Sequence, residues 1–278
     1  MRRALAAVTA LSVSSAPIGC LMVLRRMSLA GDAMAHAVLP GAAIGFIAAG
    51  LSLPAMSVGG FIAAMAVALL AGFVSHATPQ RDDASFAAFY LIALALGVLL
   101  VSLHGSPVDL MHMLFGSVLA VDDAALVQIA LVSSGTLCAL ALMYRPLVLH
   151  SLDPGHLRSV GGPGAAAHVL LLVLVVANLV SSFLALGTLL AIGLMMLPAA
   201  SARFWVEGLP AMAAAAAAIG AVSGAAGLLV SFHAELPSGP CIVLICGAVY
   251  MVSLLFGRRN GLLAGHLPKS LYRARAGS

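Results

Sequence analysis

Asp32 and His36 stand four residues apart in the segment GDAMAHAVLPG, residues 31–41, which opens a long apolar run. A spacing of four places both side chains on one face of a helix. A carboxylate and an imidazole together suit divalent ions such as Zn²⁺ and Mn²⁺. The alternative is structural: Asp32 caps the helix and His36 bonds a backbone carbonyl. The pair is therefore a candidate metal site with a structural alternative.

Two ligands from one chain are too few for a cation that takes about four. A two-fold dimer would bring two copies of Asp32 and two copies of His36 around one axis. The ligand count therefore predicts, as a hypothesis, a homodimer with the metal site on its axis.

The composition around this pair is that of a membrane protein. Of the 278 residues, 63% are hydrophobic and 8% are charged, whereas soluble domains carry about 25% charged residues. One soluble core cannot bury that much apolar surface, so we predict an all-α polytopic membrane protein. The basic residues are scattered at the ends of apolar runs and form no face for nucleic acid.

Apolar runs of about 20 residues, the length that spans a bilayer, recur along the chain. The stretch 166–203 has no polar break, so the expected count is nine, or eight if this stretch is one span. The segment SSFLALG, residues 181–187, is the expected turn. The piece 110–121 is too short to span and is expected to be re-entrant or interfacial. The nine runs are about 4–24, 33–50, 55–75, 86–103, 124–143, 166–183, 186–203, 210–231 and 240–257.

Nine spans put most basic clusters on one side of the membrane, which the positive-inside rule makes cytoplasmic. The N-terminus is then outside and the C-terminus inside, although Arg2 and Arg3 conflict with this orientation. The longest cytoplasmic loop, residues 144–164, could form a short helix after Asp153 and Pro154. The clusters are Arg25-Arg26, Arg81, Arg145 with Arg158, Arg203, and Arg258-Arg259.

Several sequence motifs that would indicate an enzyme are absent. The chain has no G-x-x-x-x-G-K-[ST] motif for ATP phosphates, no H-E-x-x-H and no G-x-S-x-G. It therefore cannot itself cradle ATP phosphates; that it is a transport subunit and not an enzyme, with ATP hydrolysis on a separate chain, is what the family resemblance given next implies. Gly41-x-x-x-Gly45 and Gly220-x-x-x-Gly224 could allow close helix packing, or could be chance pairs in a chain rich in small residues.

The segment RRMSLAGDAMAHAVLPGAAIGF, residues 25–46, resembles the signature of the metal-ion ABC permeases, which import zinc or manganese. Within this family it resembles the zinc-uptake permease of Gram-negative bacteria. Four more blocks resemble the same family in the same order, so the likeness covers nearly the whole chain. They are VDLMHMLFGSVLAVDD (108–123), SLDPGHLRSVGG (151–162), ALGTLLAIGLMMLPAASAR (185–203) and LPSGPCIVL (236–244).

The resemblance implies an ABC importer permease fold, one domain over residues 1–278, in the bacterial inner membrane. It implies two permease subunits, two separate ATPase subunits and a periplasmic metal-binding protein. Asp32 and His36 are then residues of the metal path. Zn²⁺ is the expected cargo, and the sequence does not distinguish it from Mn²⁺ or iron. The cytoplasmic segment is expected to couple to the ATPase. Its residues are Leu152, Asp153, Pro154, His156, Leu157, Arg158 and Gly161.

Two other functions stay open on the sequence. One is an ABC permease for a metal chelate, such as a siderophore or cobalamin, with Asp32 and His36 structural. The other is a stand-alone secondary transporter or a membrane scaffold. The outer loops also hold polar residues that could pass a cation inward or simply face solvent. These are His104, Asp109, His112, His233 and Glu235.

Overall fold

The structure is a computed structural model that describes residues 1–50, 52–79, 82–104, 121–152, 159, 161–259 and 261–263. These residues form ten helices and no strand. The helices are α1 (Arg2–Leu24), α2 (Ser28–Ala49), α3 (Leu53–Ala77), α4 (Asp82–His104), α6 (Asp123–Leu142), α7 (Tyr144–Leu152), α9 (Gly164–Leu186), α10 (Thr188–Ala202), α11 (Leu209–Ala234) and α12 (Ser238–Phe256).

Each of the nine predicted spans corresponds to a helix in the described residues. Eight of them are long and apolar enough to cross a membrane, and the ninth, α10, is a shorter apolar helix. Its 15 residues rise about 22 Å, less than the roughly 30 Å of a hydrocarbon core. The predicted break in 166–203 is confirmed at Gly187, whose φ of +91° a side chain would disfavour.

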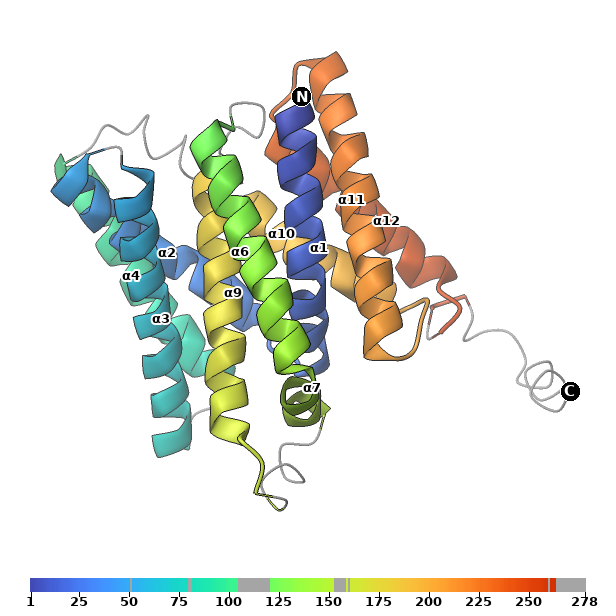
Figure 1. Cartoon of the computed structure of the whole chain (residues 1–278), viewed down its shortest axis with the longest axis horizontal. Helices are drawn as coiled ribbons and strands as arrows, with labels where there is room; N and C mark the ends of the chain where they lie inside the picture. The colour runs from blue at the N-terminus through green and yellow to red at the C-terminus, as the bar shows by residue number, and fades with distance from the viewer. Residues whose placement is uncertain are drawn as a thin grey trace, which may run out of the picture.

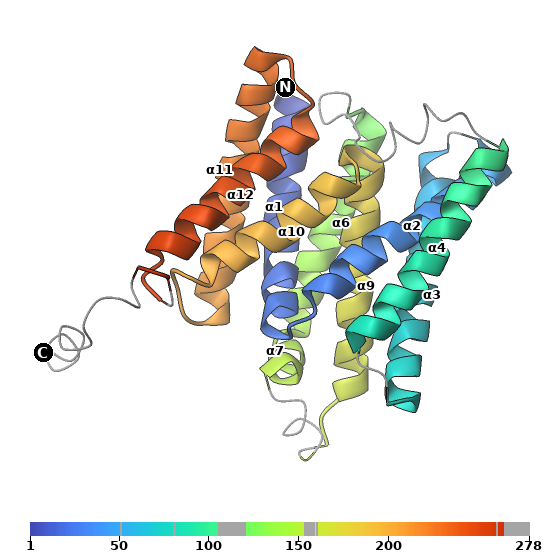
Figure 2. The same ribbon diagram turned by 180° about the vertical axis from the view of Figure 1, so that it is seen from behind.

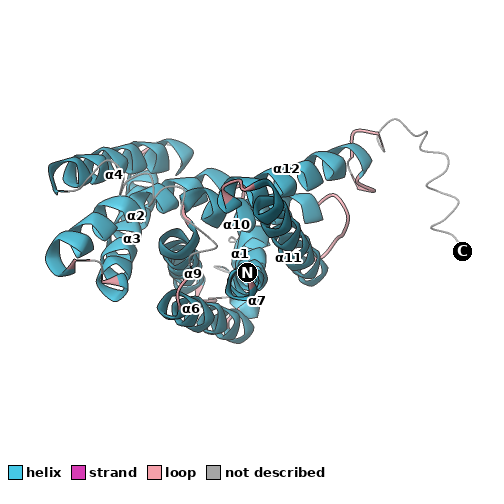
Figure 3. Cartoon of the chain, turned by 90° about the horizontal axis from the view of Figure 1, so that it is seen from above, coloured by secondary structure: helices cyan, strands magenta, loops and turns pink. Residues whose placement is uncertain are grey.

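The helices form an upright set crossed by an oblique set. Seen from behind, α2, α10 and α12 run obliquely across the more upright α1, α6, α9 and α11 (Figure 2). The view along the bundle places α2, α3 and α4 together at one side and α11 and α12 at the other (Figure 3). Most of α1, α2 and α9 is buried inside the chain, whereas no more than about a third of α3, α4, α6, α11 and α12 is buried. The exposed helices therefore present apolar faces that lipid or a partner must cover.

Glycines let the helices approach closely, as the two small-residue pairs suggested. A Cβ on Gly41 or on Gly59 would collide with the backbone carbonyl of the other glycine, so α2 and α3 touch backbone to backbone. Gly45 lies 2.6 Å, measured from an added Cβ, from the Ala55 carbonyl oxygen of α3. Gly220 and Gly224 of α11 pack against the side chains of Ser12 and Val8 on α1. Both pairs are packing sites, which in lipid is the main source of helix association.

A buried polar cluster joins α1, α6 and α9 in the middle of the bundle. The Asn178 amide donates to Thr136 Oγ1 at 2.7 Å and to the Leu174 carbonyl at 2.9 Å. Ser14 donates to Asn178 Oδ1 at 2.9 Å, and Ser133 donates to Ser14 Oγ at 3.1 Å. All four polar side chains are buried. The three helices are thus tied together by hydrogen bonds that lipid cannot replace.

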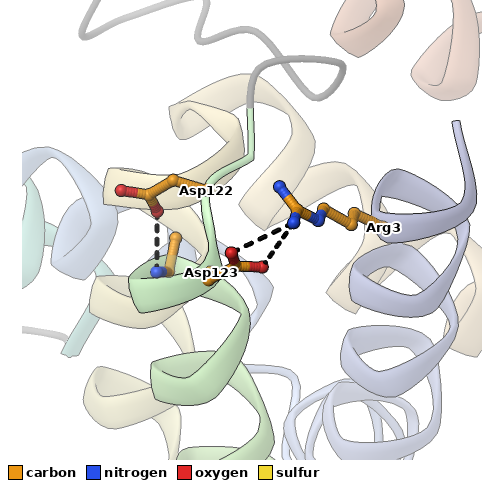
Figure 4. A network of polar contacts seen from close by, with 4 residues as sticks. Arg3, Asp122 and Asp123 are labelled. Atoms are coloured by element: carbon orange, nitrogen blue, oxygen red, sulfur yellow. Dashed lines mark hydrogen bonds and ion pairs between the residues drawn. The ribbon is translucent and has the colours of Figure 1, made fainter.

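The two ends of the bundle carry different charged residues, and which side of the membrane each end faces stays a prediction. The N-terminus and α7 lie at opposite ends (Figure 1). Arg25 lies at the α7 end, because its Nη1 is 3.2 Å from His168 Nδ1 at the start of α9. At the other end Arg3 contacts Asp123 Oδ1 at 2.9 Å (Figure 4). An acidic partner therefore accompanies Arg3, one of the two arginines that conflicted with an outside N-terminus.

One part of the sequence-based topology needs correction. Residues 144–152 were expected to be loop, with a short helix only after Asp153. They form α7, which buries Leu147 and His150 against α9 and its neighbours. Two buried side chains on one face were enough to order a short helix that hydropathy alone does not reveal. Residues 153–158, where the short helix was predicted, and the piece 110–120 lie outside the described residues.

Candidate metal site

Asp32 and His36 both lie within α2, not at its end. The N-cap of α2 is Met27, and the helix begins at Ser28. Asp32 therefore stands more than one turn inside the helix, and the structural alternative in which it caps the span is wrong. The predicted start of this span, residue 33, was late because Ser28 and Asp32 lower the local hydropathy.

The two side chains face each other. His36 Nε2 lies 3.5 Å from Asp32 Oδ1, which is long for a hydrogen bond but close enough for both atoms to reach one ion. The His36 side chain is 27% exposed and the Asp32 side chain is 46% exposed. A carboxylate inside a membrane helix is expensive and marks a functional path when it faces a cavity or a partner.

Asp32 and His36 keep partial exposure in a stretch of α2 that is otherwise buried. Between residues 30 and 43 they are the two residues that are not buried, whereas the exposed Leu29, Ile44 and Ile47 lie before and after this stretch. The helix packs inside the chain through its contacts with α3, α4 and α9. The pair therefore interrupts an otherwise buried part of α2.

The helix that carries the site is held firmly at that level. Pro40, one turn after His36, has no N–H to donate to the His36 carbonyl, which weakens α2 there. Gly97 of α4 packs against this point, since an added Cβ would lie 2.9 Å from Pro40 N. Tyr90, also on α4, places its ring centroid 5.8 Å from that of His36, with the planes tilted by 30°. Tyr90 could not be singled out from the sequence, because a tyrosine in an apolar run is typical of a packing residue.

The ligand set of a single chain is incomplete. Within the described ranges, no group of three or more His, Cys, Asp or Glu side chains could hold a metal ion. Asp32 and His36 thus offer two candidate ligands, a half-site, and metal binding there stays a prediction. A stable site needs ligands from elsewhere.

The other predicted site residues are only partly described. Leu152 is 64% exposed at the end of α7, and Gly161 adopts a φ of +68° in an exposed turn. Asp153, Pro154, His156, Leu157 and Arg158, the remaining coupling residues, lie outside the described residues. The segment predicted to couple to the ATPase therefore begins at the end of α7, and its coupling role stays a prediction.

The outer polar residues do not join the Asp32–His36 pair where they can be placed. His233 is exposed near the end of α11, with Nδ1 2.8 Å from the Leu229 carbonyl. Glu235 follows it in a left-handed turn. Asp109, His112 and the side chain of His104 lie outside what the structure describes.

Comparison with known proteins supports the resemblance seen in the sequence. The family model described as "ABC 3 transport family" matches residues 1–257. The manganese transport system membrane protein MntC of Halalkalibacterium halodurans is 32% identical over 264 residues, covering 95% of this chain and 89% of that protein. The chelated iron transport system membrane protein YfeD of Yersinia pestis is 30% identical, covering 92% of this chain and 85% of that protein.

A solved structure shares the fold. PsaBC from Streptococcus pneumoniae, in complex with Fab, aligns with a TM-score of 0.85 and 28% identity, covering 94% of this chain and 93% of that chain. The all-helical bundle, the eight long apolar helices and the family match agree with one another. The chain therefore belongs to the ABC 3 transport family and is a multi-pass permease of the bacterial inner membrane.

Proposed function

We propose that this permease moves a divalent metal cation into the cytoplasm, with Asp32 and His36 as its contacts on the cation path. The observation that carries this proposal is the pair itself: a carboxylate and an imidazole 3.5 Å apart, partly exposed on a membrane helix. The names of the two relatives, one for manganese and one for chelated iron, support a metal cargo. A path that binds through few ligands also lets the ion leave.

The cargo that we propose first is Mn²⁺. The zinc expected from the sequence finds no support in the names of these relatives, which specify manganese or iron. Imidazole and carboxylate accept both Mn²⁺ and Zn²⁺, and raw affinity favours Zn²⁺ at most such sites. The name of the Yersinia pestis relative favours one second candidate, a metal chelate. In that case Asp32 and His36 would not touch the metal.

A second copy of the chain is the partner that the half-site needs. Two chains that face each other through the Asp32–His36 pair would supply two carboxylates and two imidazoles. Four such ligands suit tetrahedral Zn²⁺ and leave positions for water on Mn²⁺, which prefers octahedral coordination. The partial exposure of both side chains supports this homodimer.

ATP hydrolysis belongs to a separate ATPase subunit, since the chain lacks a phosphate-binding motif. We propose that the ATPase docks on the loop between α7 and α9, near exposed Leu152 and Gly161. A periplasmic metal-binding protein would deliver the cation at the opposite end. ATP-driven motion of the coupling loop would then alternate the access of the two-chain site. Low pH should slow uptake, because a histidine that binds metal must be neutral.

The test is metal content in metal-starved bacteria that lack this gene. Cells are complemented with wild type, with His36→Ala or with His233→Ala as a matched control, at equal amounts in the membrane. We expect wild type and His233→Ala to restore manganese, and His36→Ala to restore it at least about tenfold less well, the loss typical of metal-site defects. Mass spectrometry of washed cells measures manganese, zinc and iron together.

The other outcomes are informative in different ways. If wild type restores zinc or iron in place of manganese, the proposed cargo is wrong, and the proposed cation path through Asp32 and His36 is unaffected. Equal restoration by wild type and His36→Ala would make His36 a packing residue and favour the chelate. Failure of the complex to retain an ATPase during purification would contradict the ABC mechanism and favour a stand-alone transporter.

A further inference from the structure

The face of α4 that packs on α2 carries a regular stripe. Phe86, Tyr90, Ala93 and Gly97 follow one another at spacings of four, three and four, which is one face of a helix. Phe86 and Ala93 are buried, and Gly97 meets α2 at Pro40. Tyr90 is thus anchored by neighbours on both sides, at the level where α2 presents His36.

The Tyr90 ring lies against the His36 ring. Their centroids are 5.8 Å apart and their planes are tilted by 30°, within the separation at which aromatic rings attract each other. Asp32 Oδ1 lies 3.5 Å from Nε2 of the same imidazole. His36 is therefore held between a carboxylate on its own helix, α2, and an aromatic ring on the neighbouring helix α4.

An imidazole without such neighbours would rotate. The terminal torsion of histidine is broad, and a metal site needs each ligand in a fixed orientation supported by the residues around it. Asp32 is one neighbour of the imidazole. It is itself a ligand candidate and must be free to turn toward the ion. Tyr90 carries no charge and is not a metal ligand candidate by its ring, so it can hold the imidazole through the whole cycle.

We propose that Tyr90 is a positioning residue that orients His36 for taking and releasing the cation. This inference rests on the proposed function of His36. The ring provides the support, because the observed contact is between rings. The candidate site thus extends from α2 to α4. Any motion of α4 relative to α2 would change how Tyr90 contacts the imidazole of His36.

The test compares Tyr90→Leu, Tyr90→Phe and Tyr250→Leu in manganese uptake by cells, at matched membrane amounts. Tyr250 is the matched control, because it packs edge-on against Phe204, with centroids 6.1 Å apart, on the distant helix α12. We expect Tyr90→Leu to lower the uptake rate about tenfold, the size of effect seen when support for a metal ligand is lost. Tyr90→Phe and Tyr250→Leu should stay within about twofold of wild type.

Two measurements keep the outcomes apart. The thermal unfolding of purified Tyr90→Leu should match that of Tyr250→Leu, since each loses one aromatic contact. Uptake by Tyr90→Leu equal to that of wild type would overturn the proposal, and so would failure of Tyr90→Phe to rescue, because the hydroxyl would then be the working group. His36→Ala is measured in the same assay: if it transports normally, the proposed function of His36 fails first, whatever Tyr90 does.

Discussion

Two groups of polar side chains lie within the helices of this permease, and they are satisfied to very different degrees. Asn178, Ser14, Ser133 and Thr136 are buried where α1, α6 and α9 meet, and each has a partner in the chain within 3.1 Å. Asp32 and His36 are only partly buried on α2, with one contact of 3.5 Å between them.

The difference separates structure from function. In lipid an unsatisfied polar group costs several kcal/mol, so a fully paired cluster is explained by the helices it joins. A half-exposed carboxylate is not explained in that way, because the chain that carries it gives it too few partners. The two groups should therefore respond in opposite ways to substitution: the first through stability, the second through transport.

The largest expected effect comes from removing the charge of the α2 pair. Asp32→Asn keeps the size of the side chain, but it replaces one acceptor oxygen with an NH2 donor and removes the charge that attracts a cation. Manganese uptake should fall at least about tenfold, while the temperature of thermal unfolding stays the same or rises, since a charge in a membrane helix is costly. Radiolabelled uptake and thermal unfolding of the same preparation measure both. If the variant loses transport only in proportion to the folded protein that it loses, Asp32 is a structural residue.

The opposite response is expected at the buried cluster. Asn178→Leu removes the amide N–H that donates to Thr136 of α6 and the amide oxygen that accepts from Ser14 of α1. Interhelical hydrogen bonds in membranes contribute about 0.6 kcal/mol each and at most about 1.7. The variant should lose about 1–2 kcal/mol of stability, with uptake per folded molecule within about twofold of wild type.

A matched pair of serines on α6 controls this result. Ser133 is buried and donates to Ser14, whereas Ser134 is exposed and donates only to the Ala130 carbonyl of its own helix. Ser133→Ala should therefore destabilise the protein measurably more than Ser134→Ala in thermal unfolding. Equal effects would mean that the cluster contributes nothing beyond each helix's own bonds.

The sequence predicted the helices because their signal is local. Apolar runs fixed all nine spans to within a few residues, and the polar residues of SSFLALG marked the break that Gly187 makes. The spacing of Asp32 and His36 likewise predicted a shared face. Each of these depends on residues close together in the chain, where helical geometry is nearly invariant.

What the sequence could not predict depends on contacts between distant segments. Serines and asparagines in apolar runs do not reveal whether they face lipid or each other, so the cluster around Asn178 was not foreseen. Tyr90 meets His36 only because Gly97 lets α4 approach Pro40. The helix α7 was read as loop, because its order comes from burying Leu147 and His150 against other helices.

The smallest expected effect is at an ion pair outside both groups. Arg3 and Asp123 are 59% and 74% exposed at the end of the bundle (Figure 4), and pairs of this kind contribute about 0.2–1 kcal/mol. Arg3→Gln should lower the free energy of unfolding by no more than this, and high salt should reduce the difference from wild type, since salt screens exposed charges. Thermal unfolding at low and high salt measures both. A loss of stability as large as that of Asn178→Leu would contradict the comparison. The exposed pair would then stabilise the packing of α1 on α6 as much as the buried cluster does.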